Sequence, residues 1–447
     1  MNKKYLIIIF GLVILFTSIL ITRKDTSAVY KLKERVSLIS NTSEWINTKK
    51  AIEGLEAELL RNPENKTTEL KLAQAYLQEG RVTGDHSYYD ALAYSLIQKV
   101  LKREPENFEA LCCKATLEAS AHQFTDALNT SQQAITINPY NAYIYGVLCD
   151  ANVELGNYKQ AIAAADKMSS IRPDIRSYSR VSYLREIHGD YTGAIDAMKL
   201  ALSAGVPGLE QTEWTRVYLG RLYETIGQVK EAEKWYKESI SIRPNYAPAL
   251  AALGNLAQQN GQYKEALVFY QNAAKTMTDY SYHQKTGEIY MALGKSDLAK
   301  ENYEKALDVL IKHQHPTNEE SGIGHNIDRE LAQVFISMKE YEKAYESSKY
   351  EYNRRPNNID VCETYAWACF LKGSKQEAQY YILKSLRTNS SNPVLLWKAS
   401  TILSANNHPL VAQSYMRKAS SINPGIAGIM QLQYANQNEL AANYHEK

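Results

Sequence analysis

The sequence predicts an all-α fold in which pairs of short helices repeat along a single array. Prolines recur at intervals of 34 residues, at positions Pro105, Pro139, Pro173 and Pro207. The segment Gly-x-Tyr-x-x-Ala also recurs, at residues 156–161, 189–194 and 261–266. The 33 tyrosines, against 7 phenylalanines, indicate repeated positions that need a large ring with a polar tip. A period of about 20 to 50 residues is typical of arrays in which each unit packs only on its neighbours.

The first element, residues 1–25, contains an uncharged apolar stretch from Tyr5 to Thr22. Its length is at the lower limit for a transmembrane helix. We favour a retained signal anchor. A cleaved secretory peptide is the first alternative, and a buried core helix is the second. Cleavage after Ala28 is disfavoured because the charges of Arg23, Lys24 and Asp25 separate that site from the apolar run.

The charges around this stretch do not settle its orientation. Lys31, Lys33 and Arg35 follow it, and charge counting would then hold the rest of the chain in the cytoplasm. The five cysteines also suit a reducing compartment. Long domains, however, often cross regardless of such charges. We therefore expect a single-pass membrane protein with an extracytoplasmic array. The alternatives are a cytoplasmic array and a protein secreted after cleavage.

The array itself is predicted over residues 66–426. A lead-in over 26–65 precedes it and holds half a repeat at 44–62. A polar helix over 427–447 is expected to cap it. About ten helix pairs fit the array, and we expect their first helices to begin at Lys66, Phe108, Ala142, Ile175, Glu213, Ala247, Tyr280, His325, Ile359 and Pro393.

Each kind of marker residue has a physical reason. Gly156, Gly189 and Gly261 lie where the first helix of a pair should end, a place that often needs a left-handed backbone. A proline such as Pro139 ends the second helix, since it cannot continue one. Small residues such as Gly254 let two helices approach closely, and tyrosines such as Tyr270 fill the remaining space.

Three insertions break the period, near residues 80–89, 203–212 and 312–324. Long loops often carry function, but these are more simply explained as tolerated changes in the spacing of the array. The first is predicted to lengthen the turn inside the first helix pair. The third contains possible metal ligands, namely His313, His315, Glu319, Glu320 and His325. They lie on one segment without rigid spacing, so we predict a solvated loop and no metal site.

The remaining residues argue against catalysis, cofactors and nucleic acid. The net charge is +2, and no stripe of basic and aromatic residues is present. None of the five cysteines forms Cys-x-x-Cys. The phosphate-binding Gly-rich loop, the Gly-x-Ser-x-Gly nucleophile motif and the His-Glu-x-x-His zinc motif are all missing from the sequence. We therefore predict a protein that is not an enzyme and binds no cofactor.

The repeat resembles the tetratricopeptide repeat (TPR) family. The unit that begins at Ala247 carries the family's bulky and small positions, at Leu250, Leu253, Gly254, Gly261, Tyr263, Ala266, Tyr270 and Ala273. The resemblance implies a TPR α-solenoid, a right-handed superhelix of helix-turn-helix repeats, here preceded by one transmembrane helix. It also implies that the first helices line a concave groove that binds a protein or peptide.

Positions 2, 5, 9 and 12 of each first helix face that groove in the family. They select the candidate groove residues Tyr143, Asp150, Arg176, Tyr183, Trp214, Arg221, Asn255, Arg329, Glu363, Trp367, Phe370 and Trp397. The Lys and Asn pair with which some members clamp chaperone tails is not found at positions 5 and 9, so that partner is disfavoured. Trp367, Phe370 and Trp397 form either an aromatic anchor site or the packing between neighbouring repeats.

These observations predict a membrane-tethered scaffold that docks or assembles a membrane or envelope complex. The first alternative is a structural protein that assembles with itself. The second is an accessory subunit that regulates an enzyme. The sequence does not identify the partner, the pathway or the oligomeric state.

Overall fold

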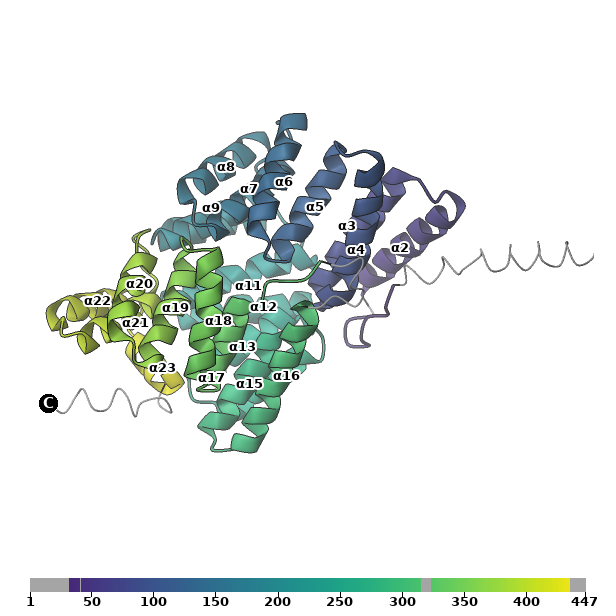
Figure 1. Ribbon diagram of the computed structural model, residues 1–447. Coiled ribbons are helices and arrows are strands. Elements are labelled where there is room, and N and C mark those ends of the chain that lie inside the picture. Colours follow the sequence, from purple (N-terminus) through teal and green to yellow (C-terminus); the bar gives the residue numbers. More distant parts are fainter. Residues whose placement is uncertain (1–31, 41, 315–322, 435–447) are drawn as a thin grey trace, which may run out of the picture.

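The computed structural model describes residues 32–40, 42–314 and 323–434. Residues 32–40 contain no helix, and the rest of the described chain folds into helices joined by short connections (Figure 1). After α2 (Ser43–Arg61) come ten helix pairs within the described ranges, followed by α23 (Ile426–Tyr434). The pairs are α3 (Lys66–Thr83) with α4 (His86–Arg103), α5 (Phe108–Ser120) with α6 (Phe124–Ile137), α7 (Ala142–Glu154) with α8 (Tyr158–Ile171), α9 (Ile175–Ile187) with α10 (Tyr191–Ser203), α11 (Glu210–Thr225) with α12 (Val229–Ile242), α13 (Ala247–Gln259) with α14 (Tyr263–Ala274), α15 (Tyr280–Ala292) with α16 (Ser296–Gln314), α17 (Asp328–Ser337) with α18 (Tyr341–Arg354), α19 (Ile359–Lys372) with α20 (Lys375–Ser385), and α21 (Pro393–Ala405) with α22 (Pro409–Ile422).

The first helices begin close to the residues that the period predicts. Eight of the ten start at the expected residue, while α11 starts at Glu210 instead of Glu213 and α17 starts at Asp328 instead of His325. The starts are locally encoded by asparagines such as Asn107, Asn141 and Asn392, whose side chains accept hydrogen bonds from the first turn of the helix. Such a cap stabilises a helix by about 1 kcal/mol.

Glycine and tyrosine pack against each other inside the pairs. A Cβ atom on Gly254 would lie 3.2 Å from the Tyr270 ring, and one on Gly220 would lie 2.4 Å from the Tyr236 ring. The ring thus occupies the space that the missing side chain leaves. The Tyr236 hydroxyl donates to a Glu224 carboxylate oxygen at 2.7 Å, which explains why tyrosine is preferred to phenylalanine at this position.

The insertions take three different forms. The first does not lengthen a turn, and that prediction is wrong: α3 and α4 are each 18 residues long and only Gly84 and Asp85 separate them. The extra residues continue the helices because Val82 and Tyr89 are buried there. The second forms a connection from 204 to 209 between α10 and α11. The third extends α16 to Gln314, and residues 315–322 lie outside the described part of the chain.

The two ends of the chain are described only in part. The predicted anchor, residues 1–25, lies outside the described residues, as do residues 435–447 of the predicted cap. Among the helices of the described residues, a length and apolarity sufficient to cross a membrane do not occur together. Residues 426–434 of the cap form α23, in which Ile426 and Met430 are buried against the last helix pairs.

The array coils so tightly that its early and late parts touch. Backbone and side-chain hydrogen bonds join turns inside the early pairs to connections between the late ones. They run from Thr278 to Thr83, Asn326 to Ala121, Asn358 to Glu154, Thr388 to Ile187 and Asn423 to Thr225. Three of these bonds join residues 198 to 204 positions apart, or about six repeats of 34 residues. We call this line of contacts the seam. Figure 1 shows the helices α5–α9 stacked on α17–α20 along it.

Candidate binding interior of the superhelix

The first helices of the early pairs line a cavity of about 820 Å³. Three predicted groove residues, Tyr143, Asp150 and Arg176, lie in its wall. Arg180 donates to both carboxylate oxygens of Asp150, at 2.9 and 2.5 Å, and so holds this carboxylate in place. The Tyr143 hydroxyl lies 2.7 Å from the hydroxyl of Thr116, and the Arg176 guanidinium lies 5.5 Å from the Tyr143 ring centre. This wall therefore offers aromatic rings and charged groups together.

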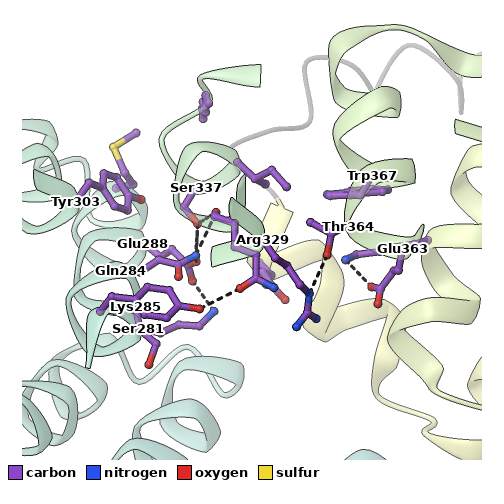
Figure 2. Close-up of a pocket in the computed structure, with 17 residues that line it drawn as sticks. Ser281, Gln284, Lys285, Glu288, Tyr303, Arg329, Ser337, Glu363, Thr364 and Trp367 are labelled. Carbon is purple, nitrogen blue, oxygen red and sulfur yellow. Dashed lines mark hydrogen bonds and ion pairs between the residues drawn. The ribbon is translucent and has the colours of Figure 1, made fainter. Parts of the chain in front are cut away.

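The first helices of the late pairs line a second cavity, of about 330 Å³ (Figure 2). The predicted residues Arg329, Glu363 and Trp367 line it, with a polar network on the opposite wall. In that network Ser337 donates to Glu288 at 2.8 Å, Gln284 donates to Ser337 at 2.9 Å, and Lys285 pairs with Glu288 at 2.8 Å. Glu363 pairs with Lys398 at 2.8 Å.

Arg329 points across this second cavity toward Thr364, whose hydroxyl lies 3.5 Å from the Arg329 Nε (Figure 2). Among the described residues it makes no ion pair within 4.0 Å. Burial lowers the pKa of Arg329, but the charge of Asp360 and other nearby carboxylates outweighs that effect and raises it overall. The guanidinium is therefore a fixed cation facing the cavity.

Charged groups from both parts of the array act on Asp360. Asp360, on α19 of the late array, has a pKa raised first by burial and then by the carboxylates of Glu363, Glu154 and Glu186, against the lowering effect of Arg329. Glu154 and Glu186 belong to α7 and α9 of the early array, so charges from both parts act on the same space. The predicted residue Tyr183 lies there too: burial raises the pKa of its hydroxyl, and so do the charges of Asp360 and Glu154.

Three more predicted residues lie between or beside the cavities. Arg221 pairs with Glu186 at 3.0 Å and stacks 4.0 Å from the Tyr218 ring centre. Asn255 donates to the carboxylate of Glu224. Trp214 is 41% exposed and lines a separate cavity of about 310 Å³ beside Arg243 and Tyr246. The structure thus does not bring Trp214 into the cavities that hold the other groups.

The C-terminal aromatic group packs between helices. Trp367 is only 3% exposed and belongs to the core cluster of the last pairs, in which Trp397 and Phe370 are partly buried. Its ring centre lies 5.2 Å from that of Phe370 and 5.8 Å from that of Trp397. The packing interpretation accounts for these contacts. Trp367 supplies a wall of the second cavity and does not project as an anchor.

Some interior residues were missed by the sequence prediction. Ser281, Gln284 and Glu288 occupy positions 2, 5 and 9 of the helix that begins at Tyr280, so the rule that selected the others would have found them. Arg180 occupies position 6, to which the rule does not apply. Its ion pair with Asp150 depends on the angle between α7 and α9, which the sequence does not provide.

Two histidines of the third insertion are not on a solvated loop, and that part of the prediction is wrong. His325 is 7% exposed and lies 3.1 Å from the carboxylate of Asp90 on α4. His313 ends up beside it, with ring centres 5.7 Å apart. The other predicted ligands of this segment, His315, Glu319 and Glu320, lie outside the described residues.

Comparisons with known proteins agree with this architecture. Models of the tetratricopeptide repeat match residues 118–185, 218–246, 235–268 and 280–309. The human protein O-mannosyl-transferase TMTC1 is 25% identical over 199 residues, which are 38% of this chain and 22% of that protein. The cellulose synthase operon protein C of Pseudomonas fluorescens is 25% identical over 214 residues, which are 44% of this chain and 16% of that protein. The matches thus span less than a quarter of the length of either relative.

Among solved structures, a thermophilic TPR protein of Thermus thermophilus aligns with a TM-score of 0.36 and 22% identity, over 41% of this chain and 98% of that one. The family-model matches fall within α5 to α16, and the one over residues 280–309 begins at Tyr280, where the period predicts the start of a repeat. The family models therefore identify tetratricopeptide repeats within residues 118–185, 218–268 and 280–309 of this chain.

Proposed function

We propose that this chain is a non-catalytic scaffold whose superhelical interior binds an extended segment of a partner protein. The observation that supports this most is that first helices line both cavities, of about 820 and 330 Å³, and that charges from both parts of the array act on Asp360. Binding grooves that hold a peptide need a few fixed polar groups beside larger surfaces for packing. The pairs Asp150 with Arg180 and Glu363 with Lys398 supply the former, and Tyr143, which is 37% exposed, supplies the latter.

The charges of the interior favour a segment that carries carboxylates. Most interior cations are paired with acidic residues, but among the described residues Arg176 and Arg329 make no ion pair within 4.0 Å. A guanidinium can bind a carboxylate through two parallel hydrogen bonds. An Asp, a Glu or a C-terminal carboxylate of the partner would thus complete the coordination of these two side chains.

Replacing Arg329 with alanine is expected to weaken partner binding by roughly tenfold or more, because a hydrogen bond to a charged group contributes about 1.5–3 kcal/mol. A photoreactive residue at Ser281, in the second cavity, would first identify the bound segment by crosslinking. The affinity of that segment would then be measured by calorimetry. Arg417→Ala, at an exposed site on α22, is the matched control and should bind normally.

Two results would contradict this proposal. One is equal affinity of the wild-type protein and Arg329→Ala. The other is crosslinking from an outer position such as Lys418 to the same segment with equal yield. Crosslinks that join two copies of this chain would instead favour the self-assembling structural protein. Crosslinks to an enzyme whose rate changes on binding would favour the accessory subunit.

We further propose that residues 1–25 anchor the array in a membrane, with the array outside the cytoplasm, where it docks or assembles a membrane complex. The uncharged run from Tyr5 to Thr22 supports the anchor. The name of the Pseudomonas relative associates that protein with a cellulose synthase operon, which fits such a role, although the match covers 16% of it. A tether would raise the local concentration of the bound partner at the bilayer.

Deleting residues 1–25 is expected to move the protein from the membrane fraction to the supernatant. The full chain should stay with the membranes after alkaline extraction, since a transmembrane helix resists it. External protease should degrade the array of the full chain while the membrane that holds the anchor stays intact. Release of the full chain by alkali would contradict the anchor, and protection from protease would contradict the orientation.

A further inference from the structure

Two histidines and an aspartate meet at the seam. His86 and Asp90 lie one helical turn apart on α4, and His325 precedes α17. The His86 Nδ1 and the His325 Nε2 each lie 3.1 Å from the same Asp90 oxygen, Oδ2. One ligand atom from each of the three residues lies within 4.8 Å of the other two. Asp90 lies in the early part of the array, and His325 lies in the late part, 235 positions further along the chain. The cluster therefore joins the two parts.

The backbone around His325 is held firmly in place. Its N–H donates to the His313 carbonyl at 3.1 Å, and the next N–H, of Asn326, donates to the Ala121 carbonyl at 3.0 Å. The Asn326 side chain donates to the His122 carbonyl at 3.0 Å, and Gln123 donates to the Gly324 carbonyl at 3.0 Å. The imidazole is therefore presented to Asp90 by a fixed segment, which lowers the entropy lost when a ligand binds.

The carboxylate of Asp90 can accept more hydrogen bonds than the described residues donate to it. Its side chain is 2% exposed, and its second oxygen, Oδ1, has no hydrogen-bond partner among the described residues. A buried carboxylate oxygen without a partner is unfavourable by about 1–3 kcal/mol. Neutral imidazoles and a carboxylate are the ligands that Zn²⁺ takes in mixed nitrogen and oxygen sites.

We propose that His86, Asp90 and His325 bind one divalent transition-metal ion of the Zn²⁺ type, which ties the early part of the array to the late part. Four ligands about 2.0–2.1 Å from zinc in a tetrahedron lie roughly 3.3 Å from one another, close to the two separations of 3.1 Å. A water molecule completes the set. His313 lies beside the site, with its ring centre 5.9 Å from that of His86 and 5.7 Å from that of His325.

The surroundings suit such a role. The His86 side chain is 24% exposed, which leaves the ion a way in from solvent. An ion bound by both parts of the array stabilises the closed seam, because the site exists only while the seam is formed. This inference does not depend on what the interior binds.

The test uses the full chain, stripped of metal with EDTA and titrated with ZnCl₂ in a calorimeter. We expect one ion per chain for the wild-type protein. Asp90→Asn and His86→Gln should each bind zinc at least about tenfold more weakly. His408→Gln, which removes a histidine at the start of α22 far from the cluster, should bind as the wild type does. Zinc should also raise the Tm of the wild-type protein and of His408→Gln but not of Asp90→Asn.

His86→Gln keeps the test valid if Asp90→Asn fails to fold, because His86 is the most exposed of the three ligands. Circular dichroism checks the fold of each variant before titration. The proposal is overturned if the wild-type protein binds no stoichiometric zinc, or if folded His86→Gln binds it as tightly as the wild type. Loss of binding in His408→Gln would also overturn it, since the ion would then lie elsewhere.

Discussion

Replacing Gly156 with alanine is expected to open the seam and to lower the free energy of unfolding by roughly 3 kcal/mol or more. Gly156 ends the turn between α7 and α8 with a φ of +75°. An added Cβ would lie 1.9 Å from the Asn357 carbonyl oxygen and 2.3 Å from the Asn357 carbonyl carbon. Both are backbone atoms and cannot move without shifting the connection before α19, so the two parts of the array must separate there.

Gly261→Ala is the matched control for this prediction. Gly261 has nearly the same backbone, with a φ of +71°, but an added Cβ would meet nothing within 4 Å. Gly261→Ala should therefore lose only the free energy needed to hold alanine in the left-handed backbone conformation, about 1 kcal/mol. Chemical denaturation gives the two values, and hydrogen exchange at Ile359, whose N–H donates to the Tyr158 hydroxyl at 2.9 Å, reports opening of the seam. Equal losses of stability would show that the contact with Asn357 is not important.

The period and the local signals were enough to predict the fold. Asparagine caps, glycines with a left-handed backbone and prolines act within a few residues, so the helix starts at Phe108 and Ala142 could be read from sequence alone. The same rules failed where packing decides. Val82 and Tyr89 continue α3 and α4 through the first insertion because those side chains are buried, and burial depends on neighbours that the sequence does not place.

The sequence predicts which residues of a repeat face the candidate site, but it does not predict which repeats meet across that site. The resemblance to the TPR family assigns Arg329 and Glu363 to inward positions, and both line a cavity. It does not reveal that Glu154 and Glu186, about 200 residues earlier, act on Asp360 in the same interior. That meeting depends on the pitch of the superhelix, which sums small rotations over about six repeats. For the same reason His325 appeared to lie on an isolated loop, while its partner Asp90 lies 235 residues away.

Replacing Glu79 with alanine is expected to lower the free energy of unfolding by about 3 kcal/mol, because it leaves the buried charge of Arg35 with Glu44, at 3.5 Å, as its one ion-pair partner among the described residues. The Arg35 Nε and Nη2 donate to the two Glu79 carboxylate oxygens at 2.9 and 2.5 Å, and both side chains are at most 1% exposed. Burial lowers the pKa of Arg35, but the hydrogen bond and charge of Glu79 raise it, and the net change is an increase. The guanidinium therefore stays charged. Denaturation in urea, with the wild-type protein as reference, gives the change.

The ion pair between Arg35 and Glu79 also holds the lead-in against the array. Arg35 lies in residues 32–40, which follow the proposed anchor. Loss of its ion pair with Glu79 should therefore expose that segment to limited proteolysis. Glu104→Ala, which breaks the exposed pair with Lys66, is the control and should leave stability near that of the wild-type protein. The double change Arg35→Met with Glu79→Leu should recover much of the loss, because both charges of the buried pair are removed and Glu44 keeps its ion pair with Arg243. If Glu79→Ala is as stable as Glu104→Ala, the lead-in is held by its other contacts, such as the bond from Asn245 to the Leu38 carbonyl.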